Sequence, residues 1–102
     1  MPDPPALQHA DFAPLVGEAF TIRSSVVEHP IEATLIDARE STARPAPDAV
    51  RSPFSIQFQL PNTVQLPQGT VHVEHPAISP SDLFLVPIGT DDDGWYMEAC
   101  FN

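Results

Sequence analysis

The clearest alternation of apolar and polar residues along the chain lies in residues 54–60. Every second position there is large and apolar, and serine or glutamine fills the positions between Phe54, Ile56, Phe58 and Leu60. A period of two places these apolar side chains on one face of an extended chain. The segment therefore predicts a β-strand with one buried face and one solvated face.

Five further segments show the same period or a similar one. They comprise residues 18–24, 31–39, 70–74, 83–88 and 95–101. About six short strands, separated by turns that contain proline or glycine, are typical of a small antiparallel barrel or sandwich. We therefore expect an all-β fold, and the sequence leaves the choice between barrel and sandwich open.

The last two segments predict a hairpin. Residues 95–101 alternate strictly, and one face carries Trp95, Met97, Ala99 and Phe101. A short acidic loop that contains glycine, residues 89–94, connects this segment to residues 83–88. Two strand-like runs around such a loop are typical of a β-hairpin.

Residues 83–88 are apolar on both faces of the predicted strand. Leu83 and Leu85 point to one side, whereas Phe84, Val86 and Ile88 point to the other. A strand that is apolar on both faces must be covered on both. We expect an interaction surface among Leu83, Phe84, Leu85 and Val86, with a neighbouring subunit as the cover. The alternative is that the chain's own loops provide this cover.

The N-terminal part of the sequence predicts a leader followed by a short helical lid. Residues 1–10 are expected to form a flexible proline-rich leader, and residues 11–102 a single β domain. Asp11 suits a helix N-cap and Gly17 a left-handed C-terminal cap, so one or two helical turns are expected between them. The lid would cover the β domain with Phe12, Leu15 and Val16.

The connections between the predicted strands differ in length. Residues 41–52 are rich in proline and small residues and predict the longest loop of the chain. Residues 78–82 are expected to turn the chain into the C-terminal hairpin. Ile36 falls on the otherwise polar side of its strand, so that face is not wholly solvated.

The composition narrows the classes of partner. The chain has 102 residues, which is the length of one domain. Its net charge is −10, with four arginines and no lysine. Nucleic acids and anionic membranes bind proteins through basic patches, so we expect neither as a partner. An acidic composition is compatible with solubility and with a basic partner.

Cysteine usage and the N-terminus bear on the cellular compartment. Cys100 is the only cysteine, which excludes a disulfide within the chain. The N-terminus lacks the basic and apolar regions of a signal peptide, and no apolar run is long enough to span a membrane. We therefore expect synthesis in the cytoplasm without classical export.

His72 and Glu74 form the first of two candidate metal sites, because they share one face of a predicted strand. A third ligand would have to come from elsewhere in the chain, for example Glu28 or His29, and a credible site needs both ligand number and geometry. The favoured interpretation is that His72 and Glu74 are two exposed polar side chains.

Asp91, Asp92 and Asp93 form the second candidate site, just before Gly94. The spacing of a calcium-binding EF-hand loop would place Gly89 first and Cys100 last, and neither is an acidic ligand. We expect a solvated hairpin turn instead, in which Asp93 and Gly94 adopt the backbone conformations that tight turns require. The sequence thus predicts no metal and no cofactor.

No catalytic constellation is recognisable in the sequence. Cys100 would need a neighbouring base and a lowered pKa to act as a nucleophile, and no positive residue lies near it in sequence. We expect a small, partly buried side chain at this position. Serine-hydrolase, phosphate-loop and dinucleotide motifs are missing as well, so the sequence does not predict an enzyme.

Four stretches resemble the motifs of a known family: DFAPLVGEAFTIR, LPQGTVHVEHPAI, LFLVPIG and WYMEACFN. The family is an uncharacterised bacterial domain of unknown function of about this length, and its pattern includes LPQGTY.L.HP, LFLVPVG and YEAVFN. Val71 stands where the family has tyrosine, and Cys100 stands where it has valine. The motifs concern packing and identify no active site.

Members of this family are often encoded beside short proteins similar to phage tail-collar and tail-fibre domains. The resemblance therefore implies a structural or interaction module in a tail-like or surface-fibre assembly, which could lie outside the cell. The partner would be another protein, either a second copy in a homo-oligomer or a tail-fibre-like or collar-like neighbour. The alternative function is a small acidic binding or inhibitor module for a basic protein or a small ligand.

Overall fold

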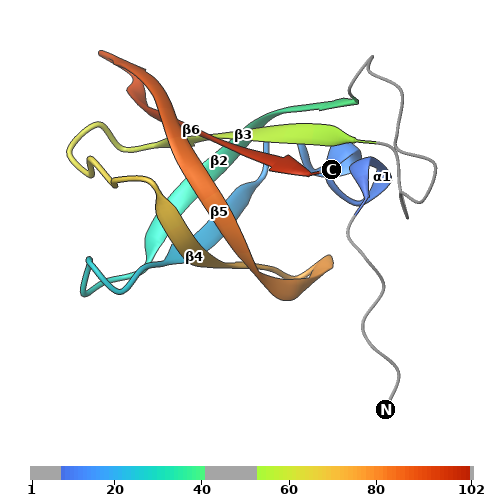
Figure 1. Ribbon diagram of the computed structural model, residues 1–102, viewed down its shortest axis with the longest axis horizontal. Helices are drawn as coiled ribbons and strands as arrows, with labels where there is room; N and C mark the ends of the chain where they lie inside the picture. The colour runs from blue at the N-terminus through green and yellow to red at the C-terminus, as the bar shows by residue number, and fades with distance from the viewer. Residues whose placement is uncertain (1–7, 41–52, 102) are drawn as a thin grey trace.

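Six antiparallel strands close into a barrel, and a short helical segment precedes them (Figure 1). The computed structural model describes residues 8–40 and 53–101. The helical segment consists of α1 (His9–Phe12) and the 3₁₀ turn η1 (Ala13–Leu15). The strands are β1 (Ala19–Arg23), β2 (Ile31–Glu40), β3 (Phe54–Leu60), β4 (Gly69–His75), β5 (Ile78–Asp91) and β6 (Gly94–Phe101). The predicted all-β fold of about six strands is confirmed, and the architecture is a barrel.

The strand order around the barrel is β1-β2-β3-β6-β5-β4, and β4 closes the circle by pairing with β1. Strands β1 to β4 and strands β3 to β6 each form a Greek key, because the outer strand of each group returns beside the first. This order places β5 directly opposite β2 across the barrel. Closure leaves each strand one inner face and one outer face.

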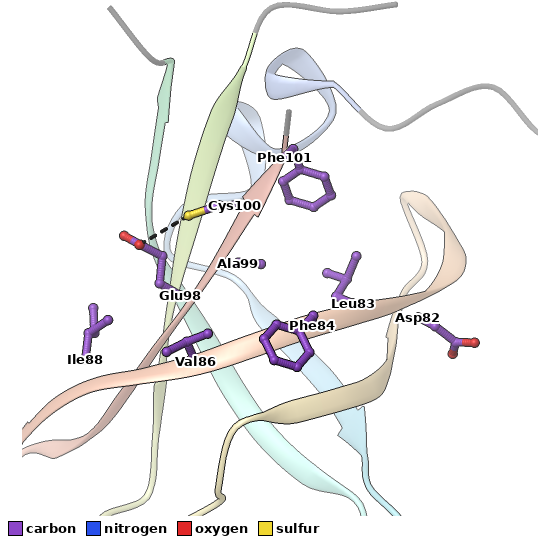
Figure 2. Close-up of a pocket in the computed structure, with 9 residues that line it drawn as sticks. All are labelled: Asp82, Leu83, Phe84, Val86, Ile88, Glu98, Ala99, Cys100 and Phe101. Carbon is purple, nitrogen blue, oxygen red and sulfur yellow. Dashed lines mark hydrogen bonds between the residues drawn. The ribbon is translucent and has the colours of Figure 1, made fainter. Parts of the chain in front are cut away.

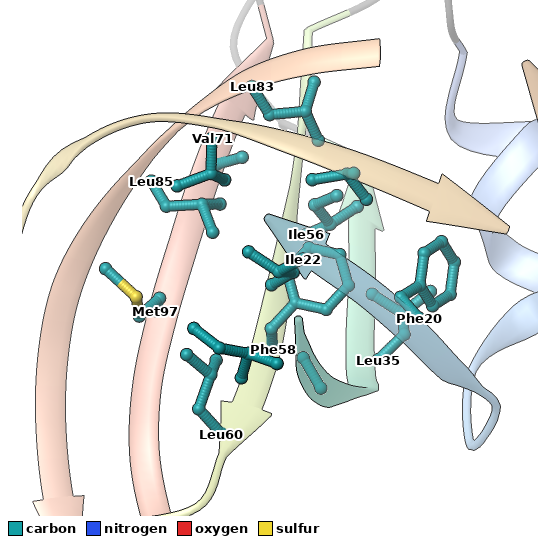
Figure 3. Close-up of a cluster of buried hydrophobic side chains, with 14 of the residues drawn as sticks. Phe20, Ile22, Leu35, Ile56, Phe58, Leu60, Val71, Leu83, Leu85 and Met97 are labelled. Carbon is teal, nitrogen blue, oxygen red and sulfur yellow. The ribbon is translucent and has the colours of Figure 1, made fainter. Parts of the chain in front are cut away.

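Apolar side chains fill the interior of the barrel. The buried core includes Phe20, Ile22, Leu35, Phe58 and Met97, which point inward from the four strands β1, β2, β3 and β6 (Figure 3). Among the residues that the structure describes, no polar or charged residue is buried. The interior of the barrel is thus filled by its own side chains.

The helical segment closes one end of the barrel, as the lid prediction requires. Phe12 is fully buried, and its ring lies 5.8 Å from that of Phe101 and 6.4 Å from that of Phe20. Leu15 is buried too, but Val16 is 45% exposed and does not belong to the lid. Gly17 has a φ of 95°, the left-handed conformation predicted for it.

The helix begins earlier than predicted, inside the segment assigned to the leader. Gln8 is the N-cap, and Asp11 lies in the first turn. The Asp11 carboxylate accepts a hydrogen bond from the Gln8 backbone N–H at 2.7 Å, and the Asp11 N–H donates to the Gln8 carbonyl. Asp11 therefore caps the helix from the third position and is not the N-cap. The predicted 41–52 loop and most of the predicted leader lie outside the described residues.

Three irregularities interrupt the strand pairing of the barrel, and in two of them an apolar residue is the additional one. The β2–β3 register passes from Leu35–Phe58 to Asp37–Gln57, so Ile36 is the additional residue of a bulge. This bulge accounts for the position of Ile36 on the polar side of the sequence pattern. On β5, the register shift between Pro87 and Gly89 makes Ile88 an additional residue in the same way.

The turn predicted at residues 78–82 is wrong, because these residues form the first part of β5. β5 pairs with β4 through His75–Ile78 and Val73–Ser81, so two β5 residues between these pairs face one β4 residue. Pro80 lies within this irregularity. Proline is tolerated at a bulge because a bulged residue need not donate to the ladder.

The hairpin turn is shorter than predicted, and Gly94 serves it in a different way. β5 continues to Asp91 and β6 begins at Gly94. Among the described glycines, Gly17 alone has a positive φ, so Gly94 does not supply a left-handed conformation. A Cβ on Gly94 would instead lie 2.7 Å from the Leu60 carbonyl oxygen and 2.7 Å from Gln59 Cγ. Glycine is required there because β3 approaches closely.

Gly94→Ala is expected to destabilise the protein by roughly 1–3 kcal/mol, the usual cost of forcing extra atoms into a packed site. The matched control is Gly89→Ala on the same hairpin, where an added Cβ would meet no atom within 4 Å. Denaturant unfolding of both variants provides the comparison. Equal stability of the two variants would contradict the assigned role of Gly94.

Candidate functional site

Three large apolar side chains lie in a row on the outer face of β5. Phe84, Val86 and Ile88 are 53%, 37% and 49% exposed. Leu83 and Leu85 point into the barrel and are buried. The structure thus divides the four predicted interaction residues into a core pair, Leu83 and Leu85, and a surface pair, Phe84 and Val86. We call the exposed row of Phe84, Val86 and Ile88 the β5 stripe.

The stripe borders a groove that forms where β5 and β6 diverge. From the hairpin turn, the two strands pair as far as Val86 and Glu98. Beyond this point the earlier part of β5 pairs with β4, and the end of β6 pairs with β3. The groove between the diverging strands has a volume of about 340 Å³ (Figure 2).

The lining of the groove is mainly apolar, with one carboxylate on each side. Its residues come from β5, namely Asp82, Leu83, Phe84, Val86 and Ile88, and from β6, namely Glu98, Ala99, Cys100 and Phe101. The Asp82 carboxylate lies 3.0 Å from Nδ1 of His72. The Glu98 carboxylate accepts a hydrogen bond from Gln57 Nε2 at 3.1 Å. These contacts hold both carboxylates at the sides of the groove.

Cys100 lies on the outer face of β6, beside the stripe. It is exposed, so the expectation of a partly buried side chain is wrong. Partial removal of the thiol from water raises its pKa, and the Glu98 carboxylate, which accepts a hydrogen bond from Sγ at 3.4 Å, raises it further. A raised pKa keeps the thiol protonated and weakly nucleophilic at neutral pH.

The two arginines that the structure describes do not line the groove. Arg23 on β1 forms an ion pair with Glu74 at 2.6 Å. Arg39 on β2 forms an ion pair with Asp37. Arg39 is two strands from Cys100 of the lining, since β3 lies between β2 and β6. The charged residues of the lining itself are both acidic.

His72 and Glu74, the first pair weighed as metal ligands, have other partners in the structure. His72 lies against Asp82, and Glu74 forms an ion pair with Arg23. Within residues 8–40 and 53–101, no three histidine, cysteine, aspartate or glutamate side chains come together as a metal-binding group. In the same ranges no helix is long and apolar enough to cross a membrane.

The acidic turn of the C-terminal hairpin is organised by the side chain of Asp91. Its Oδ1 accepts hydrogen bonds from the backbone N–H groups of Asp93 at 2.8 Å and Gly94 at 3.1 Å. The Tyr96 hydroxyl donates to the same carboxylate at 3.0 Å. The bond from Asp93 contributes most to lowering the pKa of Asp91, and those from Tyr96 and Gly94 add to it. This carboxylate is engaged within the turn, which favours a structural role over cation binding.

Sequence reasoning missed part of the groove. Ile88 was predicted on the same face as Phe84 and Val86 and is exposed there, but it was not among the four residues named for the interaction surface. Asp82 and Glu98 were not singled out, because their positions at the groove depend on the cross-strand register. Val86 and Glu98 form the β5–β6 pair furthest from the hairpin turn, and the sequence alone does not show where the two strands diverge.

The protein is a small closed β-barrel with a helical cap at one end and one strand, β5, whose outer face is apolar. A family model described as "Domain of unknown function (DUF6916)" matches residues 7–101. The chain belongs to this family. Neither the curated proteins nor the solved structures contain a match to the chain.

Asp91→Asn is expected to lower the melting temperature at neutral pH. The pKa of Asp91 is lowered in the folded protein, so its ionised form stabilises the fold above the unfolded-state pKa of about 3.9. That contribution is lost as the pH falls through the lower folded-state pKa. The difference in melting temperature between the parent protein and Asp91→Asn should therefore shrink below about pH 4.

The control for this experiment is Asp92→Asn, since Asp92 joins the turn through its main-chain oxygen, which accepts from Asn62. It removes the same charge and should have the smaller effect at neutral pH. If the difference in melting temperature between the parent protein and Asp91→Asn stays constant down to about pH 2, the charge of Asp91 does not stabilise the turn.

Proposed function

We propose that this protein is a non-enzymatic interaction module that binds another protein through the β5 stripe and the adjoining groove. The observation that carries the proposal is the exposure of Phe84, Val86 and Ile88 side by side on one strand. Isolated exposed apolar residues are common, but a contiguous exposed patch beside a groove is typical of a binding surface.

The dimensions of the surface favour a macromolecular partner over a small ligand. The stripe extends over four residue steps, or roughly 13 Å of strand, and continues into the groove. The groove volume of about 340 Å³ is close to the lower limit of small-molecule pockets, about 300 Å³, and one side of it is the open stripe. Phe84 would serve as an aromatic anchor at the centre of a larger protein contact.

Two further features support an interaction role over catalysis. Cys100 lines the groove and carries a thiol, which is a potential nucleophile. Its pKa is raised, whereas the pKa of an activated thiol is lowered. The carboxylates of Asp82 and Glu98 are on opposite sides of an apolar lining and hold hydrogen bonds with neighbouring side chains.

The biological setting that we propose is a subunit of a tail-like or surface-fibre assembly. The support for this setting is the resemblance of the sequence motifs to a family whose members are encoded beside tail-collar-like and tail-fibre-like proteins. A stripe that remains exposed on the folded chain suits a subunit that is covered by a neighbour after assembly.

Aspartate substitutions on β5 are expected to separate folding from binding. Leu85→Asp places an unpaired charge in the core and should prevent folding. Phe84→Asp and Val86→Asp should leave the melting temperature within a few degrees of the parent protein, because both side chains are exposed. They should abolish binding, because a charge would have to be desolvated at the centre of the contact.

The measurement is quantitative recovery of co-purifying proteins from cells that express each tagged variant at the native level. The matched control is Val26→Asp, which adds the same charge at a valine that is 64% exposed between β1 and β2. Specific proteins should be lost with Phe84→Asp and Val86→Asp and retained with Val26→Asp. If all three variants recover the same proteins as the parent, the stripe is not the docking surface.

A further inference from the structure

The electrostatics of the groove define the chemistry of its partner. We propose that the groove binds an extended segment of a different, positively charged protein, and that a second copy of this chain does not occupy it. This proposal rests on the proposed function, since it assumes that the stripe and groove are the docking surface. The proposal adds the kind of side chain that the partner presents to the groove and the spacing of these side chains along the partner.

The charges of the groove favour a cationic partner. Asp82 and Glu98 are the two charged residues of the lining, and both are acidic. They lie on different strands at opposite sides of an apolar floor that includes Leu83 and Ala99. The whole chain carries a net charge of −10, which extends the negative potential well beyond the groove. A partner with cationic groups at both sides would neutralise these carboxylates while its apolar side chain fills the floor.

The same charges oppose pairing of two copies through this surface. A two-fold interface brings identical patches together, so it would place Asp82 and Glu98 of one copy against the carboxylates of the other. Two copies would also meet with a net charge of −10 each. The described arginines, Arg23 and Arg39, already form ion pairs with Glu74 and Asp37. Neither arginine lines the groove, so neither is placed to pair with Asp82 or Glu98 of its own chain.

The positions of the two carboxylates indicate the spacing of the partner's cations. Asp82 lies four residues before Val86, and Val86 pairs directly with Glu98. Four residues of strand span roughly 13 Å. In an extended segment, residues four apart are separated by the same distance and point to the same face, as does the residue midway between them. The matching pattern is a basic residue, an apolar residue two positions on, and a second basic residue two positions further.

This pattern can be tested with two synthetic peptides and the intact protein. The first is the blocked peptide Thr-Arg-Thr-Phe-Thr-Arg-Thr, and the second replaces both arginines by glutamate. Binding is followed by amide shifts in nuclear magnetic resonance titrations at low salt. We expect the arginine peptide to perturb Phe84, Val86 and Cys100 and to bind at least about tenfold more tightly than the glutamate peptide. Its affinity should fall as salt is added, because partly exposed charge pairs are screened.

Charge-neutralising variants test whether the effect is local. Glu98→Gln should weaken binding of the arginine peptide roughly two- to fivefold, the range expected for one partly exposed charge pair. The matched control is Glu32→Gln, which removes the same charge from an exposed position on β2, on the opposite wall. Equal weakening by both variants would mean that the peptide responds to net charge and not to the groove, which would overturn the proposal.

The remaining outcomes distinguish this proposal from the proposed function. Equal binding of both peptides, or no binding of the arginine peptide, would overturn the cationic partner. Whether the stripe is the docking surface would then be decided by the co-purification experiment with Phe84→Asp and not by the peptides. Sedimentation that shows dimers of the parent protein, lost in Phe84→Asp, would assign the groove to a second copy. That result would overturn the cationic partner and leave the stripe as an interface.

Discussion

The narrow interior of the barrel is the constraint on which the rest of this structure depends. Closure of six strands gives each strand one inner face, and the apolar side chains on those faces bury one another completely. The described core contains no polar or charged residue that could divert the interior to binding or catalysis. The outer surface is the part of the barrel that varies from strand to strand, and the outer surface of β5 differs from that of its neighbours.

The contrast between β3 and β5 shows this difference. On β3 the outward residues are serine and glutamine, and Gln57 and Gln59 donate hydrogen bonds to Glu98 and to the Asp93 carbonyl. On β5 the outward residues are Phe84, Val86 and Ile88. Both strands fill the core with their inner faces, so the core does not require an apolar exterior on β5. Such a surface is accounted for if a partner covers it.

The sequence was sufficient for those parts of the fold that depend on alternation alone. Residues 54–60 form the strand that their pattern predicted, and Leu85 and Met97 lie in the core. The bulges were not predictable, because an additional residue such as Ile88 shifts the register without changing the composition. The turn expected at residues 78–82 was wrong for the same reason, since β5 runs through an irregularity there that tolerates Pro80.

The candidate site was half predictable. Phe84 and Val86 could be recognised as apolar residues on the second face of a strand, whereas Asp82, Glu98 and the groove follow from where the hairpin strands diverge. Close approach of strands was equally hidden, as Gly94 illustrates. Its need for glycine comes from the Leu60 carbonyl on β3 and not from the turn. Local patterns report which face a residue takes, and contacts between distant strands decide what surrounds it.

The acidic surroundings of the stripe would shape how a partner arrives as well as how it binds. A surface with net negative charge accelerates encounter with a positively charged protein and slows encounter with another copy of itself. Apolar contacts with Phe84 would then determine how long the complex lasts. Added salt should therefore slow the association of the two proteins, whereas substitution of Phe84 should speed the dissociation of the complex.

The central claim is that the β5 stripe and its groove are open in the free chain and covered in the assembled protein. Cys100 tests this directly, because it is the only thiol of the chain and lines the groove. The measurement is the rate at which an uncharged maleimide labels Cys100 in the purified protein and in complexes recovered from cells. Labelling of the free protein together with strong protection in the complex is the predicted result. Equal rates in the two states would contradict the claim.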